Sequence, residues 1–130
     1  MRRATLIICL LVLAAVPSCA SRDYEMTKKA GDYTVTVKID KNPPVAGLNK
    51  MEILIKDSGG RDVTDAVVSV NYDMPAMPGM PAQNYETNAM LHGMTYHAIV
   101  NFSMAGPWTI AVKITKTGKT QTVKLNVDVK

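Results

Sequence analysis

The stretch MTYHAIVNFSMAGPWTIAVKI, residues 94–114, decides the fold. Up to Phe102 it carries apolar side chains at every even position, while Thr95, His97 and Asn101 occupy odd positions. After Gly-Pro, Trp108 begins a second alternating run. A period of two is typical of a β-strand with one buried face. The stretch therefore predicts two successive strands, with Trp108 filling the core between two sheets.

The same period recurs along the chain, and no stretch after the leader has a convincing helical period. Further strands are predicted at residues 33–39, 51–55, 66–72, 83–91 and 123–129. The mixed polarity of residues 83–91 places that strand at a sheet edge. Seven short strands separated by turn signals predict an all-β fold, an immunoglobulin-like β-sandwich of about seven strands.

The first eighteen residues are expected to be a signal peptide. Arg2 and Arg3 precede an apolar run that is short for a bilayer span and ends in small residues. The ending Val-Pro-Ser-Cys, residues 16–19, resembles a bacterial lipobox, although proline departs from the usual small residue. The resemblance implies that Cys19 becomes lipidated and anchors the protein to a membrane of the bacterial cell envelope. Ordinary secretion with a free Cys19 is the alternative.

The mature chain is expected to have two parts. Residues 19–31 are polar and without periodicity, and we interpret them as a tether in which Tyr24 and Met26 are solvated. The alternative is that these two side chains dock on the domain. Residues 32–130 form the sandwich domain. Without Arg2 and Arg3, the chain's 15 basic and 11 acidic side chains leave a net charge of about +2, which gives no nucleic-acid footprint. No catalytic arrangement is recognisable, so we expect no enzyme. Acids at positions 57, 62 and 65 are expected to be turn residues.

Residues 74–81 read Met-Pro-Ala-Met-Pro-Gly-Met-Pro. Proline fixes φ and removes a backbone donor, which favours a polyproline II segment with three residues per turn. Such a segment would present Met74, Met77 and Met80 outward along one edge. Alternatively, Gly79 bends the segment and brings Met77 and Met80 together, or the thioethers serve only as packing.

The methionines suggest a soft-metal site, because thioethers select Cu(I) and imidazole is an acceptable partner. Successive methionines of the row would lie about 9 Å apart, so one ion needs ligands from elsewhere. The turn at Gly93 supplies them if it folds beside the row. The predicted ligands are Met74, Met77, Met80, Met90 and His92. Secondary candidates are Met94 and Met104, which the pattern places in the core, and His97, expected to face solvent.

Two segments together resemble the YtkA-like domain family, which is related to FixH. They are Met74-Pro75-x-Met77 and the run from Tyr96 through Met104-Ala105-Gly106-Pro107-Trp108 to Ile110. The resemblance covers about residues 32–129. It implies an immunoglobulin-like sandwich of the bacterial envelope, often a lipoprotein, whose relatives are associated with copper handling and respiratory oxidases.

We therefore expect a lipid-anchored envelope protein that binds Cu(I) and stores it or hands it over, facing the periplasm or the outside of the cytoplasmic membrane. The alternative is a metal-free interaction module. In that case the Met-Pro segment contacts a membrane transporter or an oxidase under assembly.

Overall fold

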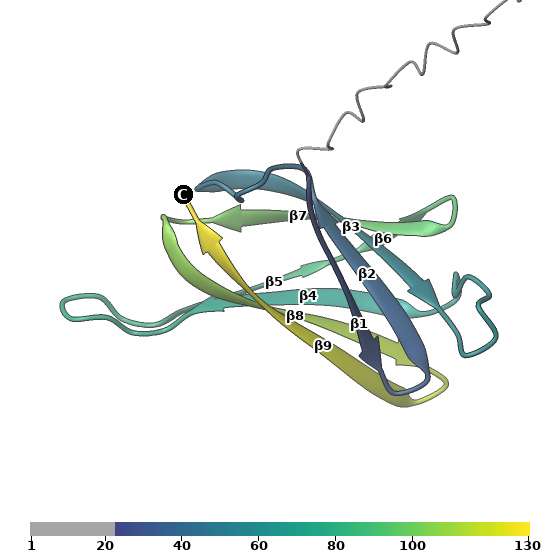
Figure 1. Ribbon diagram of the computed structural model, residues 1–130. Helices are drawn as coiled ribbons and strands as arrows, with labels where there is room; N and C mark the ends of the chain where they lie inside the picture. The colour runs from purple at the N-terminus through teal and green to yellow at the C-terminus, as the bar shows by residue number, and fades with distance from the viewer. Residues whose placement is uncertain (1–22) are drawn as a thin grey trace, which may run out of the picture.

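The computed structural model describes residues 23–130 and contains nine strands (Figure 1). The predicted signal peptide and Cys19, the predicted lipidation site, lie outside the described residues. The strands are β1 (Tyr24–Ala30), β2 (Tyr33–Ile39), β3 (Gly47–Lys56), β4 (Val67–Met74), β5 (Gln83–Asn88), β6 (Met90–His92), β7 (Thr95–Phe102), β8 (Gly106–Lys116) and β9 (Lys119–Val129). No helix that could cross a bilayer occurs in this part of the chain.

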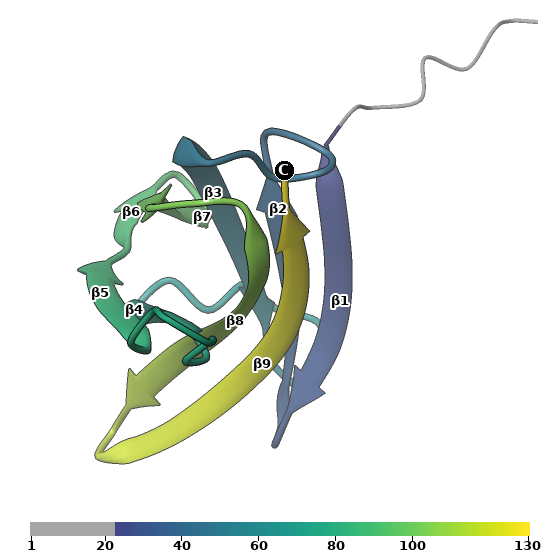
Figure 2. The ribbon, with the colours of Figure 1, turned by 90° about the vertical axis from the view of Figure 1, so that its left-hand side faces the viewer.

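The strands form two antiparallel sheets that pack face to face (Figure 2). One sheet has five strands in the order β1-β2-β3-β7-β6, and the other has four in the order β5-β4-β8-β9. This arrangement confirms the predicted β-sandwich. It has nine strands and not the seven expected, because the structure differs from the sequence-based prediction in two segments.

The first difference is β1, which occupies most of the segment assigned to the tether. It pairs with β2 from Tyr24 opposite Ile39 to Ala30 opposite Tyr33. Tyr24 and Met26 pack partly against the core instead of being solvated, and Ala30 is buried. The folded domain therefore begins at about residue 24 and not at residue 32. Glu25, Thr27 and Lys29 lie on the outer face of this edge strand, where charge is tolerated. Lys28 shares the face of Met26 and Ala30 and donates a hydrogen bond to the Lys124 carbonyl of β9.

The second difference is in residues 83–92, predicted as one edge strand ending at residue 91. The segment is extended and lies at an edge, but it changes sheets at Ala89. β5 pairs with β4 in the four-stranded sheet, whereas β6 pairs with β7 in the five-stranded sheet. The Ala89 amide donates to the Val68 carbonyl at 2.9 Å. The chain thus crosses between the sheets without a loop.

The core follows the alternation seen in the sequence. Trp108 is 1% exposed and fills the space between the sheets, as predicted. Its ring lies 5.3 Å from that of Phe102 and 6.0 Å from that of Tyr72, and its indole N–H donates to the Met104 carbonyl. Aromatic side chains of this size contribute large buried areas and specific packing geometry.

Two tyrosine hydroxyls connect the layers. The Tyr72 hydroxyl on β4 accepts a hydrogen bond from the Asn101 amide of β7, and the Tyr96 hydroxyl on β7 accepts one from the Ala66 amide just before β4. These bonds satisfy polar groups that would otherwise be costly to place near the core. They also fix how β7 lies over β4.

The strand β1 gives the first testable prediction. Removing it, so that the chain begins at residue 32, should lower the free energy of unfolding by at least about 2 kcal/mol, because Tyr24, Met26 and Ala30 lose their packing. Urea unfolding followed by Trp108 fluorescence measures the difference between segments 32–130 and 23–130. The exposed change Lys29→Thr is the control and should cost no more than about 0.5 kcal/mol. Equal midpoints for the two segments would restore the tether interpretation.

Candidate metal centre

The predicted ligands lie at two separate ends of the sandwich. The Met-Pro segment connects β4 to β5, and the Gly93 turn connects β6 to β7. Gln83 pairs with Met74, and His92 lies nine residues further along an extended chain. At about 3.3 Å per residue, an extended chain carries His92 up to roughly 30 Å from Gln83. Figure 1 shows the two loops projecting from opposite ends of the molecule. The Gly93 turn therefore does not fold beside the Met-Pro row, and the condition for one shared site is not met.

Met74 does not belong to an outward-facing row. It is the last residue of β4, is 2% exposed and belongs to the hydrophobic core. Its methyl group lies so close to Gly106 that a Cβ there would overlap it. The segment before Pro75 thus continues the alternation of β4, which carries Met74 inward together with Tyr72. This burial removes Met74 from the ligands that a dissolved ion can reach.

Met77 and Met80 are brought together, as the alternative based on Gly79 expected. The Met77 amide donates to the Met80 carbonyl at 3.0 Å, and the Met80 amide donates to the Met77 carbonyl at 2.8 Å. Pro78 and Gly79 form the two-residue turn between them, and Gly79 has φ +79°. The segment is a small hairpin and not a straight polyproline II row. Both methionines are half-buried.

At the other end, the hairpin of β6 and β7 gathers three candidate ligands on one face. Met90 is paired with His97, and His92 is paired with Thr95. Alternate residues of a strand point to the same side, so Met90, His92 and His97 share the outer face of the five-stranded sheet. The turn is two residues long, with φ +64° at Gly93. Glycine at the first position of such a turn is typical of a type II′ hairpin.

The two imidazoles lie close enough to share an ion. Their ring centroids are 5.3 Å apart, and the rings are nearly perpendicular. A zinc–imidazole bond is about 2.0 Å, and a ring centroid lies about 1.1 Å behind its nitrogen, so two rings on one ion have centroids about 5 to 6 Å apart. His97, a secondary candidate in the sequence, is therefore the best-placed partner of His92.

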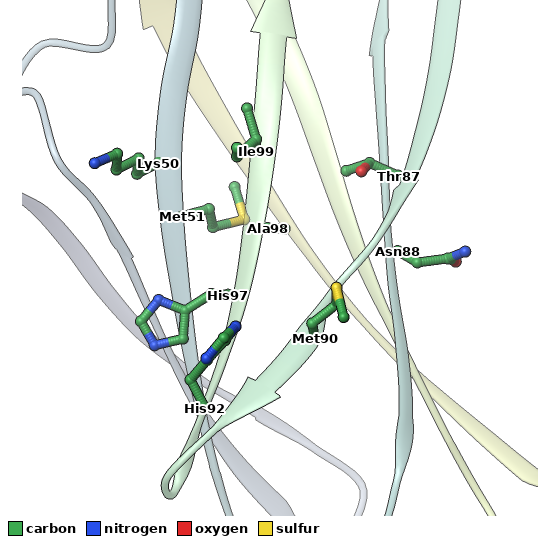
Figure 3. A pocket seen from close by; sticks show the side chains of 9 residues that line it. All are labelled: Lys50, Met51, Thr87, Asn88, Met90, His92, His97, Ala98 and Ile99. Atoms are coloured by element: carbon green, nitrogen blue, oxygen red, sulfur yellow. The ribbon is translucent and has the colours of Figure 1, made fainter.

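A hollow of about 370 Å³ adjoins the imidazoles (Figure 3). It lies between β5 and β7, and its lining residues are Lys50, Met51, Thr87, Asn88, Met90, His92, His97, Ala98 and Ile99. Figure 3 shows the two rings together, with the Met90 sulfur turned away from them. Methionine has three rotatable bonds, and Met90 is 68% exposed, so its sulfur is free to turn toward the rings.

One charged neighbour of His97, the carboxylate of Glu52, was not recognised from the sequence. Glu52 is its partner on β3, with 3.9 Å between the Glu52 Oε1 and the His97 Nδ1. This separation is too long for a hydrogen bond, so the carboxylate is a neighbour of the ring and not a bonded partner. Strand register alone places Glu52 beside His97, and register is not readable from a single sequence.

The remaining secondary candidates differ from each other. Met94 was expected in the core but is 59% exposed, because it belongs to the turn and not to β7. Met104 is half-buried and packs against the core, close to what was expected. It lies in the loop before β8, and Ser103 beside it donates a hydrogen bond to Gln83.

Asp57 and Asp65, near the β3–β4 loop, form hydrogen bonds or ion pairs with other groups of the protein. Asp57 accepts hydrogen bonds from the amides of Arg61 and Gly59, and the bond from Arg61 is the main cause that lowers its pKa. Asp65 accepts a hydrogen bond from Lys116, which lowers the pKa of Asp65 and raises that of Lys116. Between residues 23 and 130, no three side chains among His, Cys, Asp and Glu gather as metal ligands.

Comparison with known proteins agrees with the fold. The soluble domain of PmoD from Methylocystis sp. ATCC 49242 (Rockwell) has a similar structure, with a TM-score of 0.53 and 13% sequence identity. The match covers 81% of this chain and 97% of the PmoD chain. No curated protein matches the sequence significantly.

The chain is a β-sandwich that carries histidine and methionine side chains at its surface. Residues 27–113 match the YtkA-like family, and the chain belongs to that family. The match begins within β1, which agrees with the earlier start of the folded domain. The resemblance noted in the sequence is thereby confirmed.

The turn at Gly93 holds His92 beside His97, and this gives the second prediction. Gly93→Ala should strain the turn by about 1–2 kcal/mol, because L-residues rarely adopt a positive φ. No atom lies within 4 Å of the new methyl group, so the effect is purely conformational. NMR should show faster amide exchange across β6 and weaker contacts between the two rings. Unchanged ring contacts would mean that the turn does not position His92.

Proposed function

We propose that this protein is a lipid-anchored envelope protein that binds Cu(I) through His92, His97 and Met90, for storage or delivery of the ion. The observation that carries the proposal is the imidazole pair, with ring centroids 5.3 Å apart. Imidazole and thioether together suit Cu(I) better than harder ions. Cys19, if lipidated, would hold the domain at the membrane.

The position of the cluster supports exchange of the ion rather than permanent storage. The three side chains lie on a sheet edge beside an open hollow, and none is sealed in the core. A site of two or three exposed ligands releases its ion more readily than a closed four-ligand site. We therefore expect a labile ion that a partner protein can take up or supply.

The experiment is a Cu(I) titration of segment 23–130 against a competing chelator under reducing conditions. This segment contains all nine strands and the described core, and it lacks the thiols of Cys9 and Cys19. His97→Gln should weaken binding at the imidazole site at least about tenfold. His92→Gln should have a similar effect, and Met90→Leu a smaller one, because its sulfur lies further from the rings.

The matched control is Val67→Ala, an exposed change on the other sheet that should leave binding unaltered. Thermal unfolding of every variant checks that the sandwich is intact. Absence of Cu(I) binding, or binding equally strong in the double variant His92→Gln/His97→Gln, would contradict the proposed site.

One observation favours the interaction module as the second candidate function. Exposed apolar side chains surround the β6–β7 hairpin, namely Met90, Leu91, Met94 and Ile99. Apolar groups clustered on a surface are typical of contacts with other proteins. In this case Leu91→Ser/Ile99→Ser should abolish co-purification with a membrane transporter or oxidase, whereas His92→Gln/His97→Gln should leave it intact.

A further inference from the structure

We propose that Met77 and Met80 form a second, separate metal site that takes a soft monovalent cation, Cu(I) or Ag(I), through thioethers alone. The site lies at the opposite end of the sandwich from the imidazole pair, so the chain would bind two ions independently. This inference does not depend on the proposed function of the imidazole pair.

The backbone geometry places the two methionine side chains on one face of the hairpin. The two residues exchange both of their backbone hydrogen bonds, which defines an antiparallel hydrogen-bonded pair. In such a pair the side chains project from the same face, and the Cα atoms lie about 5.5 Å apart. Two sulfurs that bind one ion at about 2.3 Å need a separation of no more than about 4.6 Å. Methionine has three rotatable bonds, so two side chains on paired positions can bring their sulfurs within this distance.

The turn between them is stiff, which preserves this arrangement. Pro78 fixes its own φ, and Gly79 supplies the positive φ of +79° that the turn requires. Pro75 and Pro81 flank the hairpin and lack amide donors. A preorganised pair of ligands loses less conformational entropy on binding than two independent side chains.

The burial of the two side chains also suits ion binding. Met77 packs partly against the core, and both residues are half-buried, in contrast to the sealed Met74. Partial exposure leaves both side chains accessible, and packing against the core limits the motion of Met77. Thioethers carry no proton at neutral pH and select soft cations over Zn²⁺ or Mg²⁺.

The test counts Ag(I) ions bound to segment 23–130 by native mass spectrometry, because Ag(I) is soft, monovalent and stable in air. The wild type should bind two ions. Met77→Leu/Met80→Leu should lose one ion, and His92→Gln/His97→Gln should lose the other. Leucine conserves volume and apolarity, so the methionine variant should remain folded. Met26→Leu, on β1, is the matched control and should keep both ions.

A second variant separates geometry from composition. Gly79→Ala keeps both sulfurs but strains the turn, and nothing lies within 4 Å of the added methyl group. This variant should weaken binding of the ion at the Met77–Met80 site at least about fivefold and leave binding at the imidazole pair unchanged. Retention of both ions by Met77→Leu/Met80→Leu, or a single ion in the wild type that is lost only in the histidine variant, would overturn this inference. A single ion lost only in the methionine variant would instead support it and contradict the proposed imidazole site.

Discussion

The change of sheet at Ala89 is the constraint on which the arrangement of this molecule depends. One extended segment pairs with β4 and then with β7, and a single hydrogen bond from Ala89 to Val68 marks the crossing. Because the segment remains extended, its two ends must lie far apart. The methionine hairpin precedes it and the histidine turn follows it, so these clusters cannot share an ion within one chain.

The fold was predictable because its signals are local. The alternation around Tyr96 and Trp108 identified two core strands, and both residues are buried between the sheets. The strand β1 was missed because its sequence, Tyr-Glu-Met-Thr-Lys-Lys-Ala, has only a weak alternation. Its stability comes from pairing with β2 and from packing of Tyr24 and Met26, which are tertiary effects that local sequence does not contain.

The site was predictable in residue type but not in geometry. Histidine and methionine were recognised as the available soft ligands, yet their grouping depends on strand register and on the route of the chain between sheets. Met94 shows the sensitivity of such predictions, because extending β7 by one residue would bury a side chain that in fact lies in the turn. The pairing of Met77 with Met80 was foreseeable from Pro78-Gly79, a dipeptide typical of tight turns.

The unequal burial of the methionines has a chemical consequence. Peroxides convert accessible thioethers to methionine sulfoxide, a polar group that no longer packs with apolar neighbours. Met74 is protected inside the sandwich, whereas Met77 and Met80 are partly accessible and Met90 and Met94 are largely so. Oxidation would therefore spare the buried Met51 and Met74 and fall first on the exposed thioethers, which include those at both ends of the molecule.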